Sequence, residues 1–450
     1  MMSHKKKIQK KKKIQDENKV YKFLRNYVDW SLLHAYRDIE YNGLEKIPQD
    51  AAVIYAPNHS NALMDALVVL AIDKSRKVFV ARADIFKNPF LAKILTFLKI
   101  MPIMRIRDGV DEVKKNQEII DKSVDVLRDG IPFCILPEGT HRAQHSLLPI
   151  SKGIFRIALQ AQELITDNRD VCIVPVGIEY GNYFRYRSTV HVQIGDPINI
   201  RQYCNEHADL QTPEIINGLR ARLTRAMQEL ILYLPADEHY AASYELIAMA
   251  AERTSRALHQ QDKSLSTLEL RFRANRQTAA AIARLRETQA AEELLQQCDQ
   301  IHQMRVSEGI SLASTVPAHP WQKRGWNYLA CLLTAPYLCA CLLAIAPIAG
   351  IGKMLFRIMK DEAFRNSVRF VLQLVLWPIL MLIYGIVLYC ALPWVWASLI
   401  FVALTPAPIF AQDFFRNLRL FWSDLKLTGN RPLRERIKQA KARYFELIQP

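Results

Sequence analysis

The sequence lacks the features that mark a disulfide-stabilised or metal-binding protein. Its eight cysteines include no CxxC pair, and no histidine lies beside them at metal-ligand spacing. We therefore expect reduced, mostly buried thiols in a cytosol-facing protein, without a metal or a cofactor.

The N-terminus also lacks the apolar core of a signal peptide, although seven of its first thirteen residues are lysine. This lysine run contains no aromatic residue and no recognisable nucleic-acid fold follows it, so we expect no nucleic-acid partner. The whole chain carries 60 lysines and arginines against 44 acidic residues, a formal net charge of +16. This charge favours an anionic partner. An anionic membrane surface fits the lysine run, and a solvated tail fits it equally well.

Glycine is nearly absent from residues 205–315, which are polar, rich in alanine and helical in pattern. We find no catalytic constellation in this segment. It is interpreted as a helical spacer or a docking hairpin.

Two stretches near the C-terminus have almost no charge. Residues 326–352 are apolar apart from Asn327 and a few small polar residues, and residues 370–411 contain no charged side chain. About 20 apolar residues cross a bilayer, so the longer stretch predicts two spans joined near residues 392–394. The flanking residues are basic and should stay cytoplasmic. Pro336 and Pro347 would then allow the shorter stretch to form a bent, re-entrant or interfacial hairpin, and one ordinary span remains the alternative.

Short apolar strands alternate with amphipathic helices between residues 38 and 200. Strands are expected at 39–42, 53–56, 78–81, 131–136, 171–176 and 190–194, and helices at 62–72, 89–98, 110–128 and 154–166. The pattern predicts an α/β domain with one continuous sheet and a site at the strand ends. We divide the chain into a polybasic tail (1–19), an α/β domain with an N-terminal amphipathic helix (20–204), a helical region (205–320) and membrane-embedded helices with a basic tail (321–450).

The stretch APNHSNALMDAL, residues 56–67, joins a predicted strand to a predicted helix. His59 and Asp65 would not share a face of one helix, so they can pair only if His59 lies in the turn and Asp65 in the first helical turns. Ser60 or Asn61 is the expected N-cap. An aspartate that holds one imidazole nitrogen leaves the other free to take a proton from an alcohol. A capping histidine beside a solvated aspartate is the alternative.

A second polar cluster, LPEGTHR at residues 136–142, follows another predicted strand. Glu138, Gly139 and Thr140 offer a carboxylate, a close backbone approach and a hydroxyl, and Arg142 offers a guanidinium that matches a phosphate. Upstream, MPIMRIR places Arg105 and Arg107 where a second cation could reach the same pocket. Together with the histidine and aspartate, these residues point to a phosphate site.

Four blocks in order, NHSNALMD, MPIMR, LPEGTHR and IVPVGI, resemble the glycerophospholipid acyltransferase family (PlsC-like) over roughly residues 38–200. The family includes glycerol-3-phosphate, dihydroxyacetone-phosphate and lysophosphatidic acid acyltransferases. The resemblance implies an acyltransferase domain with a mixed sheet flanked by helices, followed here by an all-helical region and C-terminal membrane helices.

The resemblance also implies roles for individual residues. His59 would be the general base that deprotonates the acceptor hydroxyl, and Asp65 would orient it. The resulting oxygen would attack the thioester of an acyl-CoA or acyl carrier protein, without a covalent acyl-enzyme. Arg105 would bind the acceptor phosphate, and Glu138 and Gly139 would also bind the acceptor.

This sequence departs from the family at two points. Five residues separate His59 from Asp65 where most members have four, a spacing that resembles the fungal glycerol-3-phosphate and dihydroxyacetone-phosphate branch. The order Thr140, His141, Arg142 also replaces the usual Thr-Arg-Ser. Arg142 would then make the phosphate contact from one position further along the chain, or His141 would occupy the place of the usual arginine.

The sequence thus predicts a membrane-anchored acyltransferase that esterifies glycerol-3-phosphate in phospholipid biosynthesis, with its catalytic domain on the cytoplasmic face. Its partners would be acyl-CoA or acyl carrier protein, a glycerol phosphate or lysolipid acceptor, and membrane lipids. Lysophosphatidate or another lysolipid is the alternative acceptor. A catalytically silent membrane scaffold is the alternative of another class, which has no need of both His59 and Asp65.

Overall fold

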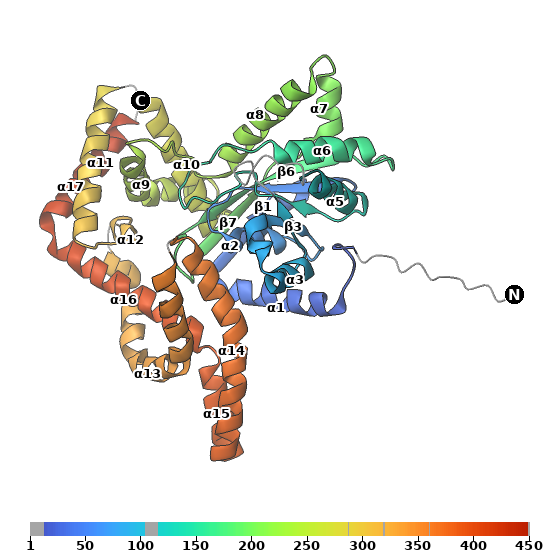
Figure 1. Ribbon diagram of the computed structural model, residues 1–450. Helices are drawn as coiled ribbons and strands as arrows, with labels where there is room; N and C mark the ends of the chain where they lie inside the picture. Colours follow the sequence, from blue (N-terminus) through green and yellow to red (C-terminus); the bar gives the residue numbers. More distant parts are fainter. Residues whose placement is uncertain (1–12, 104–115, 287, 318–319, 360, 449–450) are drawn as a thin grey trace.

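The computed structural model describes residues 13–103, 116–286, 288–317, 320–359 and 361–448. An α/β sheet flanked by helices comes first along the chain, an all-helical region follows, and long apolar helices extend away from both (Figure 1). The fold class expected from the sequence is confirmed.

One sheet runs through the α/β domain. Its strands are β1 (Asp38–Asn42), β2 (Ala52–Pro57), β3 (Val78–Arg82), β4 (Ile100–Ile103), β5 (Phe133–Cys134), β6 (Val171–Tyr180), β7 (Thr189–Ile194) and β8 (Ile198–Asn199). Their order is β1-β7-β6-β2-β5-β3-β4, with β8 paired to β6. The sheet is mixed, because β6 runs antiparallel to β7 and β8 while all other pairs are parallel.

Helices cover both faces of this sheet. The helices and short 3-10 turns of this part are α1 (Lys19–Ala35), η1 (Leu44–Lys46), α2 (Leu63–Leu70), η2 (Ala83–Lys87), α3 (Pro89–Phe97), α5 (Asn116–Arg128), α6 (Gly153–Leu164), α7 (Ile200–Glu206) and α8 (Thr212–Leu230). Ile54 of β2 packs in one core with α5, α6 and α8, whereas its neighbours Val53 and Tyr55 pack on the opposite face with α1 and α2. The alternation of side chains along β2 therefore builds two apolar layers around the strand that leads into the site.

Short elements are where the structure differs from the sequence prediction. β4 and β8 were not expected, and β5 contains two residues where residues 131–136 were expected. Phe133 pairs with both β2 and β3, and the chain then leaves the sheet toward the LPEGTHR loop, which ends the strand. The expected start of the helix at 110–128 lies outside the described residues.

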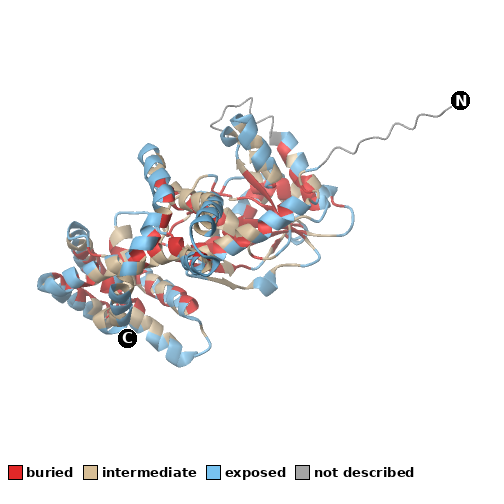
Figure 2. Cartoon of the chain, turned by 90° about the horizontal axis from the view of Figure 1, so that it is seen from below, coloured by how far each residue is buried: buried red, intermediate tan, exposed pale blue. Residues whose placement is uncertain are grey.

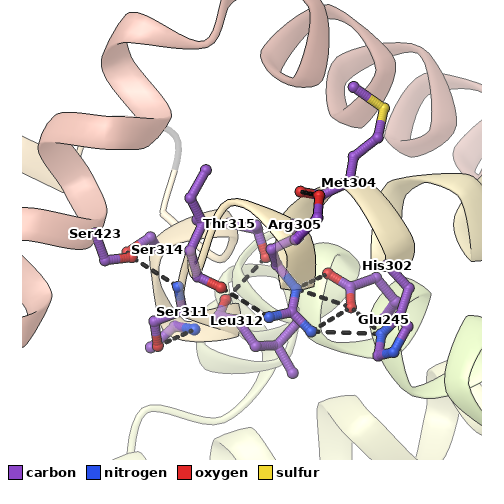
Figure 3. Close-up of polar contacts among 12 residues, drawn as sticks. Glu245, His302, Met304, Arg305, Ser311, Leu312, Ser314, Thr315 and Ser423 are labelled. Carbon is purple, nitrogen blue, oxygen red and sulfur yellow. Dashed lines mark hydrogen bonds and ion pairs between the residues drawn. The ribbon is translucent and has the colours of Figure 1, made fainter.

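The helical region consists of α9 (Tyr240–Gln261), α10 (Thr267–Leu285), α11 (Gln289–Ser307) and the short α12 (Leu312–Thr315). The C-terminal helix α17 (Arg431–Leu447) packs into the core of this region. Figure 3 shows the polar contacts that join these helices: the guanidinium of Arg305 donates to the buried carboxylate of Glu245, and Ser423 accepts from the backbone N–H of Ser311 at 2.7 Å. The helical region thus packs against residues 423–447 near the C-terminus.

Four helices form the apolar part of the molecule: α13 (Pro320–Ile358), α14 (Phe364–Ala391), α15 (Trp394–Leu404) and α16 (Ala407–Gly429). α13 and α14 are long and apolar enough to cross a membrane. The predicted break near residues 392–394 is present, but the second predicted span is not one helix. α15 has 11 residues and meets α16 at a 46° bend. Pro406 lies at this break, where it has no N–H to continue the helical hydrogen bonds of α15.

Burial differs sharply between these parts. Figure 2 shows buried residues concentrated in the strands and in the helix faces turned toward them. In the most apolar windows of α13 and α14, by contrast, only 11% and 6% of the residues are buried.

Candidate functional site

The centre of the site is the turn between β2 and α2. β2 ends at Pro57 and α2 begins at Leu63, so His59 lies in the turn and Asp65 in the first helical turn, as the spacing predicted. The side chain of Asn58 fixes the start of this turn, because it accepts from the Ile178 N–H at 2.7 Å and donates to the Ile178 carbonyl at 3.1 Å. The turn is thus tied to the neighbouring strand β6.

His59 and Asp65 form a direct pair. Nδ1 of His59 lies 2.8 Å from Oδ2 of Asp65, whose side chain is fully buried, while the His59 side chain is 16% exposed. The same carboxylate oxygen accepts the backbone N–H groups of Ser60 at 2.9 Å and Asn61 at 2.7 Å. Asp65 therefore shapes the turn and also holds the imidazole, which leaves Nε2 as the ring nitrogen not engaged by Asp65.

The helix cap is not the one expected from the sequence. Ala62 occupies the N-cap position with φ +47° and makes no side-chain cap, where Ser60 or Asn61 was expected. A positive φ is uncommon for a residue with a Cβ. The backbone N–H groups of Ser60 and Asn61, which precede the helix, donate to the carboxylate of Asp65 in its first turn, and this holds both residues in the connecting turn instead of at the cap.

Tyr180 completes the support of Asp65 from another strand. Its hydroxyl, at the end of β6, donates to Oδ1 of Asp65 at 2.7 Å. Burial and the negative charge of Asp65 raise the pKa of Tyr180 well above its ordinary value, so the hydroxyl keeps its proton and stays a donor. Both oxygens of Asp65 are thus engaged, and its orientation toward His59 is fixed.

Glu138 clamps two loops around the site. Its Oε1 accepts the backbone N–H of His59 at 2.7 Å, and its Oε2 accepts the backbone N–H of Leu148 at 2.7 Å. Burial raises the pKa of Glu138 from 4.5 to about 7, although these two backbone bonds oppose the shift. Glu138 therefore positions the histidine turn directly, a role that the sequence alone did not suggest.

The remaining predicted residues lie on the loop that follows Glu138. Gly139 has a φ of +67°, which glycine adopts without strain and which turns the chain at this point. Thr140 is half-buried beside it. The backbone N–H of Arg142 donates to the His59 carbonyl at 3.1 Å, and its guanidinium donates to Ser146 Oγ at 2.7 Å. Arg105 and Arg107 lie outside the described residues.

His141 links the site to the apolar helices. Its ring packs edge-on against the His59 ring, with 5.4 Å between the centroids, and against Phe364 of α14. Nε2 of His141 lies 2.8 Å from a carboxylate oxygen of Asp361, between α13 and α14. His141 thus contacts both the candidate base His59 and the start of the apolar helix α14.

Tyr180 and Asp361 are the site residues that sequence reasoning missed. Tyr180 lies 115 residues after Asp65, and reaches it because β6 pairs in parallel with β2. Asp361 lies 220 residues after His141. No local pattern marks either residue, and only the IVPVGI block, which ends two residues before Tyr180, pointed to that strand.

One cluster of potential metal ligands lies away from this site. Ligand atoms of Glu40, His191 and Glu269 lie within 4.8 Å of one another. However, Glu269 already accepts bonds from Asn42 and Gln193 and pairs with Arg273. Although burial opposes the shift, the bonds from His191 and Arg273 lower the pKa of Glu269 to about 2. Glu269 thus joins α10 to the sheet through these contacts, while the buried Nδ1 of His191 has no hydrogen-bond partner among the described residues.

Residues 38–179, which contain His59, Asp65 and the loop from Glu138 to Arg142, match the family model described as acyltransferase. This match supports the acyltransferase family for the α/β domain. The remaining parts of the chain lie outside the matched segment.

Two curated relatives resemble part of the chain. A chloroplastic 1-acyl-sn-glycerol-3-phosphate acyltransferase of Brassica napus is 29% identical over 129 residues, which cover 28% of this chain and 35% of the relative. Its counterpart from Arabidopsis thaliana is 27% identical over 147 residues, which cover 32% and 36%. The chain thus spans about a third of the length of the curated relatives it matches. Among solved structures, the 1-acyl-sn-glycerophosphate acyltransferase PlsC of Thermotoga maritima matches with a TM-score of 0.35 at 19% identity, over 47% of this chain and 79% of that chain.

Proposed function

We propose that this protein is a membrane-bound glycerolipid acyltransferase that moves a fatty acyl group from a thioester, acyl-CoA or acyl carrier protein, to a hydroxyl of glycerol-3-phosphate. The observation that carries the proposal is the His59 and Asp65 pair, in which both carboxylate oxygens are engaged and the imidazole is held by one nitrogen. The acyltransferase family match over the same residues supports it.

In this mechanism Asp65 keeps the proton of His59 on Nδ1, so that Nε2 accepts the proton of the acceptor hydroxyl. The hydroxyl oxygen then attacks the thioester carbonyl and forms a tetrahedral intermediate. When the carbon–sulfur bond breaks, the proton held by His59 passes to the leaving thiolate. The products are the ester and the free thiol, and His59 returns to its starting form without a covalent acyl-enzyme.

The acceptor phosphate would be bound by arginines. The guanidinium of Arg142 bonds to Ser146, and its buried Nε has no hydrogen-bond partner among the described residues. We assign the phosphate to Arg142 together with Arg105, with Gly139 and Thr140 lining the acceptor. Glu138 is assigned a positioning role, because both of its carboxylate oxygens accept backbone N–H groups.

A second acceptor, 1-acylglycerol-3-phosphate, is favoured by one observation. Both curated relatives are named as acyltransferases of that compound. It carries the same phosphate and a free hydroxyl, so the same histidine would serve it. The difference lies in the acyl chain that the site must admit.

We also place the α/β domain on the cytoplasmic face of the membrane. The ends of α13 and α14 that contact this domain carry four basic residues, Lys353, Arg357, Arg365 and Arg369. Basic residues near the ends of membrane helices favour the cytoplasmic side. Labelling of an introduced surface cysteine in sealed cells tests the assignment. Labelling from outside the intact cell would contradict it.

Transfer of a labelled palmitoyl group by the detergent-solubilised full chain tests the function. Glycerol-3-phosphate and 1-acylglycerol-3-phosphate are offered separately, first with palmitoyl-CoA and then with palmitoyl acyl carrier protein. His59→Ala is compared with His259→Ala, a control at an exposed position on α9. We expect transfer to one acceptor that collapses only in His59→Ala. Transfer that survives this change would overturn the mechanism, and no transfer from either donor to either acceptor would overturn the function.

A further inference from the structure

A cavity of about 440 Å³ lies between α13, α14 and α16. Its apolar wall includes Ile345, Ile348, Ala349, Phe356 and Leu372. Its polar lining consists of Lys353, Arg357, Arg369, Gln373 and Gln412. None of the site residues around His59 lines it, so this cavity is separate from the proposed active site.

The charges that line the cavity have a single sign. Lys353 and Arg357 are four residues apart on α13 and therefore share a face of that helix. No carboxylate is among the lining residues. Within the described ranges, neither Lys353 nor Arg357 has a carboxylate at ion-pair distance. Gathering cations without a counter-ion is unfavourable at short range, so an anion bound between them would stabilise the arrangement.

Arg369 is held in place beside these two residues. Its guanidinium lies 5.0 Å from the ring centroid of Phe356 and donates to the backbone carbonyl of Phe184 at 2.7 Å. The contact to Phe184 anchors this arginine to the α/β domain. One wall of the cavity is therefore preorganised by the folded domain rather than by the apolar helices alone.

The apolar wall limits the kind of anion that fits. α13 and α14 are long and apolar enough to cross a membrane, and Met354 and Ile358 beside the cations are 64% and 70% exposed. Small soluble anions would meet the cations but would not fill the space along the apolar wall. A phospholipid matches both the cations and the apolar wall, because its phosphate contacts the cations and its acyl chains lie along the apolar wall. Basic pockets between membrane helices on the cytoplasmic side recognise such headgroups.

We propose that this cavity binds the headgroup of an anionic glycerophospholipid of the membrane. Its phosphate lies among Lys353, Arg357 and Arg369, and the amides of Gln373 and Gln412 donate to the remaining phosphate or ester oxygens. Its volume is within the range of small-ligand sites, and it holds the headgroup and ester region while the chains continue along α13 and α14. This proposal does not depend on the acyltransferase activity.

Native mass spectrometry of the detergent-solubilised full chain tests this site. The protein is incubated with phosphatidylglycerol or with phosphatidylcholine of the same acyl chains. The double variant Lys353→Gln/Arg357→Gln is compared with Arg220→Gln/Arg225→Gln, which removes the same charge from the exposed face of α8. We expect wild type and control to retain phosphatidylglycerol, and the double variant to retain roughly tenfold less. Phosphatidylcholine should be retained weakly by all three.

A charge-conserving variant separates loss of charge from loss of fold. Lys353→Arg/Arg357→Lys should retain phosphatidylglycerol as wild type does. Equal retention by Lys353→Gln/Arg357→Gln and wild type would overturn the proposal, as would equal retention of the two lipids by wild type. Complete displacement of phosphatidylglycerol by inorganic phosphate would show a site for free phosphate instead. Because this experiment measures lipid binding, its result does not depend on whether the protein transfers acyl groups.

Discussion

The α/β domain and the C-terminal helices contain the same kinds of apolar side chain but place them oppositely. Ile54 and Phe133 of the sheet are fully buried, whereas Leu382 and Ile386 of α14 are 67% and 59% exposed. Burial of apolar surface away from water stabilises the domain. The same surface left outside on α14 suits a membrane, where no comparable force drives it inward. The type of apolar side chain therefore does not distinguish the two parts, whereas the exposure of these side chains does.

The two parts meet at the candidate site. His141 pairs with Asp361, and Tyr36, which packs against Tyr180, accepts a hydrogen bond from Asn366 of α14 at 3.5 Å. The apolar helices are thus joined to the residues that support His59 and Asp65. Substitutions in one part that leave the other unchanged should therefore have separable effects.

The largest effect should come from the His59 and Asp65 pair. His59→Ala and Asp65→Asn each remove the positioned base, and we expect kcat/KM to fall by about 10²–10⁴. Membrane association should not change, because neither residue lies on the apolar helices. Acyl transfer and vesicle flotation measured on the same preparations check both points. A variant that lost flotation along with activity would contradict the separation of the two parts.

A matched pair of truncations should show how differently the two parts use apolar side chains. Ile54→Ala empties a fully buried position and should lower the free energy of unfolding by roughly 2–5 kcal/mol. Leu382→Ala shortens an exposed side chain and should change the free energy of unfolding by less than about 0.5 kcal/mol. Denaturant unfolding in detergent measures both. Equal losses would mean that α14 is packed against protein rather than toward lipid.

Glu138 should make the stability of the α/β domain depend on pH. Its pKa is about 7 in the folded state against an ordinary 4.5. The folded protein therefore keeps a proton that the unfolded chain has released in this window, and stability falls as pH rises through it. In the wild type, this loss should lower the free energy of unfolding by roughly 2 kcal/mol between about pH 5 and pH 8, and Glu138→Gln should abolish it. Unfolding measured across this range checks it, with Glu229→Gln on α8 as an exposed control. A slope unchanged in Glu138→Gln would refute the assignment.

The smallest effect should come from Tyr180. Tyr180→Phe removes one hydrogen bond to Asp65, and we expect kcat/KM to fall about tenfold, which corresponds to the loss of a bond to a charged group. Tyr203→Phe on α7 is the matched control and should behave as wild type. Steady-state kinetics distinguish the two, and identical kinetics for both variants would show that Asp65 needs no support from β6.

Local patterns predicted the elements that are long or strongly periodic. The strands and helices that lie where periodicity placed them, within a few residues, are β1, β2, β3, β6, β7, α1, α2, α3 and α6. All of them except β1 and α3, which have no buried residue, bury apolar side chains. The two-residue strands β5 and β8 could not be bounded this way, since so short a run has no period. The helix cap at Ala62 was also missed, because the side chain of Asp65 binds the backbone N–H groups of Ser60 and Asn61 and holds both expected cap residues in the turn before the helix.

The sequence by itself determined that His59 lies in a turn and Asp65 on the following helix, because both belong to one strand-to-helix connection, and this allowed the two side chains to pair. It also determined that the C-terminal helices would be too apolar for water. Only the tertiary structure decided what surrounds them. Tyr180 reaches Asp65 through the parallel pairing of β6 with β2, and Asp361 reaches His141 through the docking of α14. Such contacts join residues more than a hundred positions apart, and their energies depend on packing that no local pattern encodes.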